Sequence, residues 1–185
     1  VTDSAGGKKG HCRKNFMQGG TIFMSITGEN IRNIAVIGHS GEGKTTLCEA
    51  MLFNGSATDR QGKVADGTTV TDFDEFEKAK KMSMYTACAY LMWKGVKINL
   101  LDLPGFYDFE GERHEGLRAA GGALLVIGAN GVLPIGAESV VDYCLRLGKP
   151  LIIFINGMDK ENADYPGTVR ALKEKYAGKL APIQI

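Results

Sequence analysis

The chain alternates short apolar runs with segments in which apolar residues recur at helical spacing. A short apolar run between turn residues favours a buried strand, whereas apolar positions three or four apart favour an amphipathic helix. The pattern predicts strands at 34–37, 85–93, 96–101, 123–129 and 150–155, and helices at 44–53, 111–120, 137–147 and 164–177.

The order of these elements predicts an α/β fold. Only Lys94 and Gly95 separate the second and third strands, and so short a connection indicates a hairpin. The remaining alternation of strand and helix predicts a mainly parallel sheet with right-handed crossovers, helices on both faces and one antiparallel edge strand. The continuous apolar run at 150–155 is typical of a strand that is buried on both faces.

Composition narrows the class of protein. With 185 residues and 44% hydrophobic residues, the chain can fill one core, so we expect a single domain. The 22 Lys and Arg residues balance 21 Asp and Glu residues, so the chain has no large net positive charge that would attract DNA or an acidic membrane. No run reaches the roughly 18 apolar residues of a membrane-spanning helix. We therefore expect no membrane partner and no direct DNA binding.

The four cysteines form no CxxC pair, which argues against a disulfide framework or a zinc site and favours reduced thiols in a cytoplasmic protein. The first 25 residues are rich in Gly and Lys without periodicity, and Met24 stands where a start codon would fit. We interpret 1–25 as a tag-like or disordered arm and 30–185 as the folded domain.

The segment Gly38-His-Ser-Gly-Glu-Gly-Lys-Thr45 fits G-x-x-x-x-G-K-[ST] between a predicted strand and a predicted helix. Its glycines let the backbone curl so that successive N–H groups point inward, and the helix presents its positive end to the same spot. A chance glycine-rich turn would lack these flanking elements. The motif predicts a P-loop NTPase, with phosphate contacts from His39, Ser40, Gly41, Glu42, Gly43, Lys44, Thr45 and Thr46.

Within this loop, Lys44 would reach the β and γ phosphates and the Thr45 hydroxyl would ligate Mg²⁺. Asp102 ends a predicted strand, which is the position of the Walker B acid that holds Mg²⁺ through water in P-loop NTPases. Gly105, three residues further on, has no side chain to keep its N–H from a γ phosphate. An ordinary Pro-Gly turn fits 102–109 equally well alone, but beside a phosphate loop the segment is interpreted as one that senses the ligand.

Together with Asn156-Gly-Met-Asp159, these segments resemble the G1, G3 and G4 motifs of translational GTPases. The resemblance is greatest to the amino-terminal G domain of elongation factor G and its paralogues, and it runs from about residue 30 to 185. It implies binding of GTP, GDP and Mg²⁺, catalytic roles for Lys44 and Gly105, guanine recognition by Asn156 and Asp159, and ribosome binding through a full-length parent. A carboxylate at 159 can accept paired hydrogen bonds from guanine, which adenine cannot supply.

Two departures from the family concern binding. The base-reading motif N-K-x-D has Gly157 in place of the lysine whose stem lies against the purine, and this loss would weaken binding by on the order of 1 to 2 kcal/mol. In place of the family's R-G-I-T in switch I, the aligned stretch ends at Ser83. The Ser83 hydroxyl offers the same oxygen ligand for the metal, although a polar residue that opens a strand is the competing interpretation.

Two further departures concern turnover and completeness. Phe106 stands where the family has the histidine that places the attacking water, and losing such a group typically costs about 10² to 10⁴ in rate. His114 is interpreted as an exposed helix residue and not as its substitute. The sequence ends before the sixth strand and the S-A-K-like loop of the family, so we expect a truncated domain.

The leading hypothesis is a GTP- and Mg²⁺-dependent switch, in which the segments 66–84 and 102–116 respond to the nucleotide and hydrolysis is weakened. Its parent would be a second elongation factor G or a ribosome-protection factor. One alternative is a regulatory or scaffolding protein that binds nucleotide without efficient turnover. Another is an ATPase of the same fold, against which Asn156 and Asp159 count.

Overall fold

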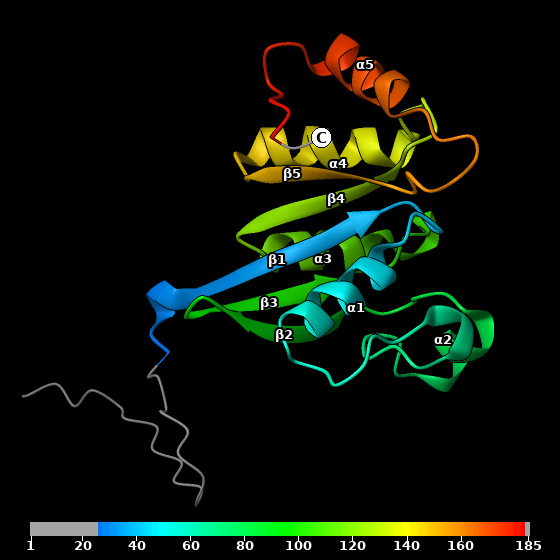
Figure 1. The fold of residues 1–185 in the computed structure, drawn as a ribbon. Coiled ribbons are helices and arrows are strands. Elements are labelled where there is room, and N and C mark those ends of the chain that lie inside the picture. Colours follow the sequence, from blue (N-terminus) through cyan, green and yellow to red (C-terminus); the bar gives the residue numbers. More distant parts are fainter. Residues whose placement is uncertain (1–25, 184–185) are drawn as a thin grey trace, which may run out of the picture.

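The computed structural model describes residues 26–183, so the arm predicted at 1–25 lies outside the described residues. Each element predicted from the sequence is present, and its ends lie within three residues of the prediction. Figure 1 shows the arrangement. The strands are β1 Ile31–Gly38, β2 Ala87–Trp93, β3 Val96–Asp102, β4 Gly122–Gly128 and β5 Leu151–Asn156; the helices are α1 Lys44–Asn54, α2 Glu75–Lys80, α3 Glu110–Ala119, α4 Ile135–Leu147 and α5 Tyr165–Tyr176.

The five strands form one sheet in the order β2-β3-β1-β4-β5. β2 and β3 pair antiparallel, and the other neighbours are parallel, which confirms the predicted topology. The hairpin turns at Lys94 and Gly95, both with positive φ (49° and 82°). Two successive residues in this conformation are typical of the tight turns that match the twist of antiparallel strands.

Helices cover both faces of the sheet (Figure 1), as predicted. On one face, Cys48 and Leu52 of α1 pack against the buried Val36, Leu100 and Val126 of the central strands. The other face packs against α3, α4 and α5. Its buried cluster includes Ala35, Ile37, Leu117, Leu125, Ile127, Val140, Val141, Cys144, Leu172 and Tyr176.

β5 is covered on one face only, so the prediction of a strand buried on both faces was wrong. Leu151, Ile153 and Ile155 pack against the core beneath α4 and α5. On the opposite face, Ile152 is 58% exposed and Phe154 is 41% exposed. α1 packs with residues of β1 to β4 and does not extend over β5. A continuous apolar run therefore does not distinguish a central strand from an edge strand.

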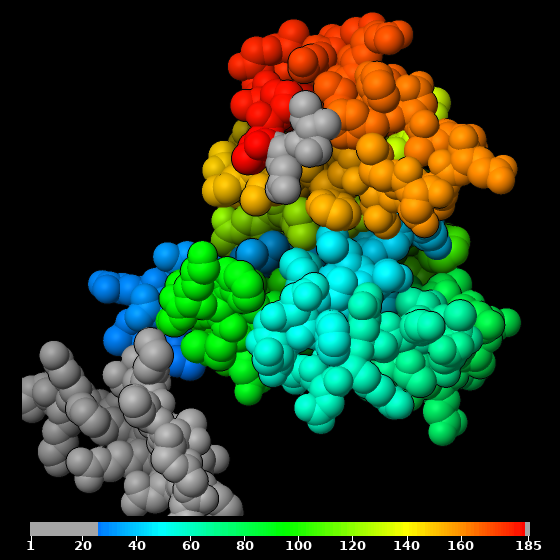
Figure 2. Space-filling model, in the orientation of Figure 1, coloured from blue at the N-terminus to red at the C-terminus, as the bar shows by residue number. Residues whose placement is uncertain are grey.

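The long segment between α1 and β2 folds back against α1, and Figure 2 shows the two as one continuous surface. Its attachment is Glu49, a fully buried residue of α1 whose carboxylate accepts hydrogen bonds from the N–H groups of Gly62 (3.0 Å) and Val70 (2.6 Å). Within the segment, Asp74 and Glu77 form a capping box at the start of α2. Buried Glu77 also accepts bonds from the N–H groups of Met84 and Tyr85.

The register of the central strands places the site. Val36 of β1 lies opposite Asp102 at the end of β3, and the N–H of Leu103 continues the pairing by donating to the Val36 carbonyl. The parallel strands β1, β3, β4 and β5 all end at the same edge of the sheet. In open α/β sheets, ligands bind beyond this edge.

Candidate functional site

The loop between β1 and α1 has the conformation that its glycines predict. Gly41 and Gly43 have positive φ, 79° and 89°, which side-chain-bearing residues rarely adopt. α1 begins at Lys44, and its N-cap Gly43 offers no side-chain acceptor. The first N–H groups of α1 have no intrahelical partner, so this helix end can bind an anion.

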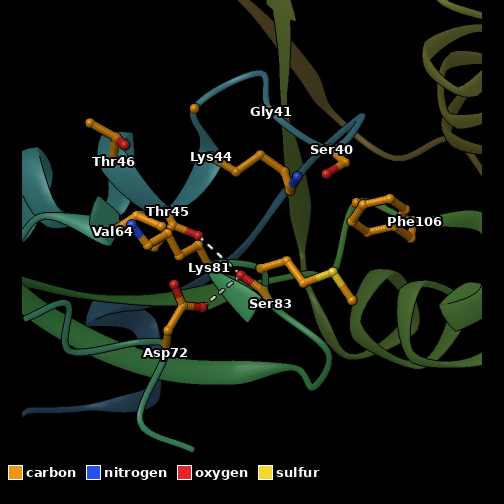
Figure 3. Close-up of a pocket in the computed structure, with 13 residues that line it drawn as sticks. Ser40, Gly41, Lys44, Thr45, Thr46, Val64, Asp72, Lys81, Ser83 and Phe106 are labelled. Carbon is orange, nitrogen blue, oxygen red and sulfur yellow. Dashed lines mark hydrogen bonds between the residues drawn. The ribbon is translucent and has the colours of Figure 1, made fainter. Parts of the chain in front are cut away.

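A pocket of about 220 Å³ lies beside this loop (Figure 3). Three parts of the chain form its walls: the loop with the start of α1, the segment before β2, and the turn after β3. Its lining residues are Ser40, Gly41, Gly43, Lys44, Thr45, Thr46, Val64, Asp72, Lys81, Met82, Ser83, Gly105 and Phe106. The pocket thus contains most of the residues that the sequence predicts to contact phosphate.

Lys44 is a buried residue that lines this pocket, and its ammonium donates a hydrogen bond to the His39 carbonyl at 3.0 Å. Burial lowers the Lys44 pKa, and the negative charge of Asp102 opposes this shift. Gly105 packs directly on the same group: a Cβ at this position would lie 2.5 Å from the Lys44 ammonium and 2.6 Å from the Ser40 nitrogen. Only glycine brings the turn after β3 this close to the loop.

Oxygen atoms from three segments are joined next to Lys44. The Thr45 hydroxyl donates to Asp102 Oδ2 at 2.8 Å and lies 3.2 Å from the Ser83 hydroxyl. The Ser83 hydroxyl in turn donates to Asp72 Oδ1 at 2.7 Å. Figure 3 shows Ser83 between Thr45 and Asp72. The two hydroxyls and two carboxylates of this network form an oxygen cluster.

Asp102 has an unusual environment within the oxygen cluster. It is buried, and its second oxygen, Oδ1, has no hydrogen-bond partner. Burial raises the pKa of Asp102 to about 6, although the Thr45 hydrogen bond and the Lys44 charge both act to lower it. A buried carboxylate oxygen without a partner is costly unless a cation or a donor meets it.

The oxygen cluster fits Mg²⁺ better than it fits a softer metal. Mg²⁺ prefers oxygen ligands and is commonly bound by one or two carboxylates together with phosphate oxygens. Thr45, Ser83, Asp72 and Asp102 supply only oxygen, and Asp102 Oδ1 is free to accept. Among the described residues, no group of three or more His, Cys, Asp or Glu side chains could hold a metal by itself. This chemistry suits a cation that shares its ligands with a phosphate.

The third loop, after β5, also reaches the phosphate loop. Asn156 donates from its side-chain nitrogen to the Glu42 carbonyl at 2.8 Å. A Cβ on Gly43 would collide with this Asn156 amide, so the left-handed glycine is also required for the contact. Asp159 lies exposed in the turn that follows. The structure thus brings together the three loops that carry the sequence motifs: the phosphate loop, the turn after β3 and the turn after β5.

Other predicted residues lie at the margin of this arrangement. Thr46 lines the pocket from the exposed side of α1. His39 is exposed, with its ring 6.2 Å from that of Tyr107. His114 is 52% exposed on α3 beside Glu110, outside the phosphate-loop pocket, as predicted for an exposed helix histidine. Phe106, in contrast, lines the pocket next to Ser40 (Figure 3).

Sequence reasoning selected the wall that faces the phosphate loop only as the segment 66–84 with Ser83, and it missed the other side chains of this segment that line the pocket. Asp72, Lys81 and Met82 line the pocket, and buried Glu49 attaches their segment to α1. The segment has no apolar periodicity, so its position depends on long-range hydrogen bonds. One local signal was available: Asp74-Glu75-Phe76-Glu77 has the D-x-x-E pattern of a capping box, which predicts the short helix α2.

A family profile described as the elongation factor Tu GTP binding domain matches residues 29–183. The chain belongs to this family. It is therefore a translational GTPase G domain, as the resemblance of its three motifs implies. Its mainly parallel five-stranded sheet, with one antiparallel edge and helices on both faces, is the P-loop NTPase fold of such domains.

Individual relatives of this GTP-binding domain are elongation factors and similar proteins. The chain is 38% identical over 174 residues to an elongation factor G-like protein of Mycobacterium tuberculosis, covering 94% of this chain and 24% of that protein. It is 38% identical over 145 residues to elongation factor G 2 of Streptomyces coelicolor, covering 78% and 21%. It is 34% identical over 174 residues to ribosome-releasing factor 2, mitochondrial, of Anopheles gambiae, covering 94% and 23%. The chain thus spans about a quarter of the length of these relatives.

A solved structure supports the same assignment to the GTP-binding family. A crystal structure of a protein from Thermus thermophilus is 36% identical in sequence and superimposes with a TM-score of 0.75. The match covers 80% of this chain and 22% of that chain.

Proposed function

We propose that residues 30–185 act as the nucleotide-dependent switch of an elongation factor G-like translation factor. The observation that carries this proposal is the convergence of three loops, those after β1, β3 and β5, at one edge of the sheet. Thr45 is bonded to Asp102, and Asn156 is bonded to Glu42, so the phosphate loop contacts both other loops directly. In this proposal, GTP with Mg²⁺ orders the segments 66–84 and 102–116, and hydrolysis releases them.

The phosphates of GTP or GDP bind residues 39–46 in this proposal. The uncapped start of α1 and the curled loop supply N–H donors, and Lys44 exchanges its bond to the His39 carbonyl for one to phosphate oxygen. Gly105 lies against Lys44 and so brings its own N–H to the terminal phosphate. Stabilising negative charge on that phosphate is the catalytic role of Lys44 and Gly105.

Guanine lies against the turn after β5 in this proposal. Asn156 fixes the turn to the phosphate loop through its bond to Glu42. The exposed Asp159 carboxylate accepts the paired N–H groups that guanine presents and adenine lacks. The base and the phosphates are thus held by loops that contact each other.

Mg²⁺ would be held by Thr45 and Ser83 directly and by Asp102 through water. Bound there, it would neutralise charge on the phosphate oxygens. The hydrogen bonds that now join these side chains hold their oxygen atoms close together before a metal enters. Asp72 keeps the Ser83 hydroxyl in place.

Hydrolysis is weak in this proposal because of Phe106. Its ring lines the pocket at the position directly after the D-x-P-G motif, where the family has a water-positioning histidine. A phenyl ring neither donates nor accepts the hydrogen bond that orients water. The same observation favours a second candidate, a regulatory or ribosome-protection-type factor that binds nucleotide without efficient turnover.

We infer the partner and the cellular location from the names of the relatives. A full-length parent would engage the ribosome and act in the cytoplasm, since the relatives are translation factors by name. In the described part of the chain, no helix has the length and apolar character needed to cross a bilayer. DNA binding is not part of the proposal because the net charge is only +1.

Calorimetric titration with GDP, GTP and ADP in excess Mg²⁺ tests this function. We expect the guanine nucleotides to bind about tenfold or more tightly than ADP. Lys44→Ala should weaken all three, whereas Lys173→Ala on the exposed face of α5 should change none. Equal affinity for GDP and ADP would remove the guanine assignment, and single-turnover phosphate release separates a slow GTPase from the regulatory candidate.

A further inference from the structure

The turn after Asn156 has an unusual feature at Gly157, the position at which the base-reading motif has lost its lysine. Gly157 has a φ of 76°, in the left-handed region. The turn is closed by a hydrogen bond from the N–H of Lys160 to the Gly157 carbonyl at 3.2 Å. This bond brings residue 160 back over residue 157.

The side chain of Lys160 occupies the space into which a side chain at 157 would project. A Cβ built on Gly157 would lie 3.2 Å from Lys160 Cε, 3.4 Å from Cδ and 3.6 Å from the ammonium. The methylene stem of Lys160 therefore runs across the bare α-carbon of the glycine. Glycine permits this approach because it has no side chain of its own.

Lys160 is not held in place by an ion pair. Within residues 26–183, no carboxylate lies within salt-bridge distance of its ammonium. The residue is exposed, and its neighbour Asp159 is exposed in the same turn. The turn therefore places an apolar surface, the lysine stem, next to a carboxylate that can accept hydrogen bonds from a base.

We propose that Lys160 is a base-binding residue: its stem covers the purine ring of the bound nucleotide and replaces, from three positions further on, the lysine absent at 157. The inference rests on the proposed function, because it places the base against this turn. The flat face of a purine buries best against an apolar stem, and lysine keeps its charged end in water while its methylenes pack. The guanine face that Gly157 leaves uncovered is then covered by Lys160.

Fluorescence titration with labelled GDP on the 185-residue chain tests this role. Lys160→Ala should weaken GDP binding about tenfold, which corresponds to burial of a few methylene groups. Lys160→Met keeps an unbranched stem without the charge and should bind GDP within about threefold of the unsubstituted protein. Lys173→Ala on α5 is the matched control, because it removes an exposed lysine far along the chain from the turn.

Inosine diphosphate gives a second readout, since it lacks the 2-amino group that Asp159 would bind. Covering a ring does not depend on that group, so Lys160→Ala should weaken GDP and inosine diphosphate equally and leave their affinity ratio unchanged. A changed ratio would overturn the covering role. Lys160→Met behaving like Lys160→Ala would also overturn it, because the charge and not the stem would then matter.

The same titrations separate this inference from the proposed function. If the unsubstituted protein binds GDP no better than ADP, the proposed function fails and the covering role fails with it. If the unsubstituted protein prefers GDP and Lys160→Ala binds GDP with unchanged affinity, only the role of Lys160 is rejected. Lys160 is exposed, so its substitution leaves the core intact, and a thermal melt checks this directly.

Discussion

The hydroxyl of Thr45 donates a hydrogen bond to Asp102 Oδ2 at 2.8 Å, and this bond joins the first turn of α1 to the end of β3. It is a buried contact between residues 57 positions apart in the chain. The phosphate loop and the turn that carries Gly105 and Phe106 are therefore positioned by one shared contact.

Thr45→Val should destabilise the protein and abolish any gain in GDP affinity from Mg²⁺. Valine has nearly the shape of threonine but cannot donate, so neither oxygen of buried Asp102 would retain a hydrogen-bond partner. We expect a loss of about 1 to 3 kcal/mol in the free energy of unfolding, measured by urea denaturation at about pH 7.5. Thr45→Ser, which keeps the hydroxyl, is the control, and equal stability of the Val and Ser variants would contradict the prediction.

Asp102→Asn should remove a pH dependence of stability. Burial raises the Asp102 pKa from 3.8 to about 6, so between these values the folded protein holds a proton that the unfolded chain releases. The stability that comes from the neutral carboxyl is therefore complete below pH 3.8 and is lost as pH rises through about 6.

The difference between the unfolding free energies of the unsubstituted protein and Asp102→Asn isolates this effect, because other groups titrate in both. From about pH 4 to 7 in the absence of Mg²⁺, the unsubstituted protein should lose on the order of 2 to 3 kcal/mol relative to the variant. A constant difference over this window would show that Asp102 ionises at its ordinary pKa.

Asp159→Asn should change the base preference of nucleotide binding from guanine to xanthine. Xanthine carries a carbonyl at C2 where guanine carries an amine, so an amide donor at 159 suits xanthine and a carboxylate suits guanine. We expect weaker binding of GDP and tighter binding of xanthosine diphosphate, each by about tenfold or more, in competition titrations. Asp164→Asn is unsuitable as a control because Asp164 caps α5, whereas exposed Glu161→Gln in the same loop should leave both affinities unchanged.

Phe106→His should raise the rate of GTP hydrolysis. An imidazole in the D-x-P-G turn can orient water, and such a group is typically worth about 10² to 10⁴ in rate. Single-turnover release of phosphate from bound GTP measures the change, and affinity for GDP should alter little. Phe106→Leu, which adds no hydrogen-bonding group, should hydrolyse GTP as slowly as the unsubstituted protein; equal rates in the His variant would mean that Phe106 does not limit turnover.

Glu49→Gln should loosen the segment that forms the second wall of the pocket. Both carboxylate oxygens of Glu49 accept from backbone N–H groups, so an amide would direct its own N–H₂ toward one of these donors. The expected cost is about 1 to 3 kcal/mol, seen as roughly five- to 150-fold faster hydrogen exchange around Gly62 and Val70. Exposed Glu29→Gln is the control, and unchanged exchange in Glu49→Gln would show that other contacts hold the segment.

Local sequence patterns were sufficient for the succession of strands and helices, for the antiparallel edge strand and for most of the phosphate loop. Gly41 and Gly43 have the positive φ values that the motif implies, and the Lys94-Gly95 turn forms the expected hairpin. These features depend on a few adjacent residues, so a sequence pattern can contain them. Asp102 was predicted from its place after a strand together with the phosphate loop, and Asn156 from the resemblance of its motif to that of translational GTPases.

Features held by distant contacts were not predictable from such patterns. The attachment of 62–70 to Glu49 joins an irregular segment to a helix, and no periodicity in 62–70 indicates where that segment lies. The exposed face of β5 depends on where α1 lies over the sheet, which an apolar run does not encode. The approach of the Lys160 stem to Gly157 depends on the conformation of the turn, and the sequence shows only that the side chain at 157 is absent.

The pairing of Val36 with Asp102 means that the alignment of two strands, and not the loops alone, sets the position of Asp102 relative to Thr45. One residue inserted within β3 would turn Asp102 to the opposite face of the sheet, since side chains alternate along a strand. An insertion at the distant Lys94-Gly95 hairpin leaves this alignment intact. The two ends of β3 thus differ in their tolerance of added length, so evolutionary change in loop size can accumulate at the hairpin without disturbing the chemistry at the other end.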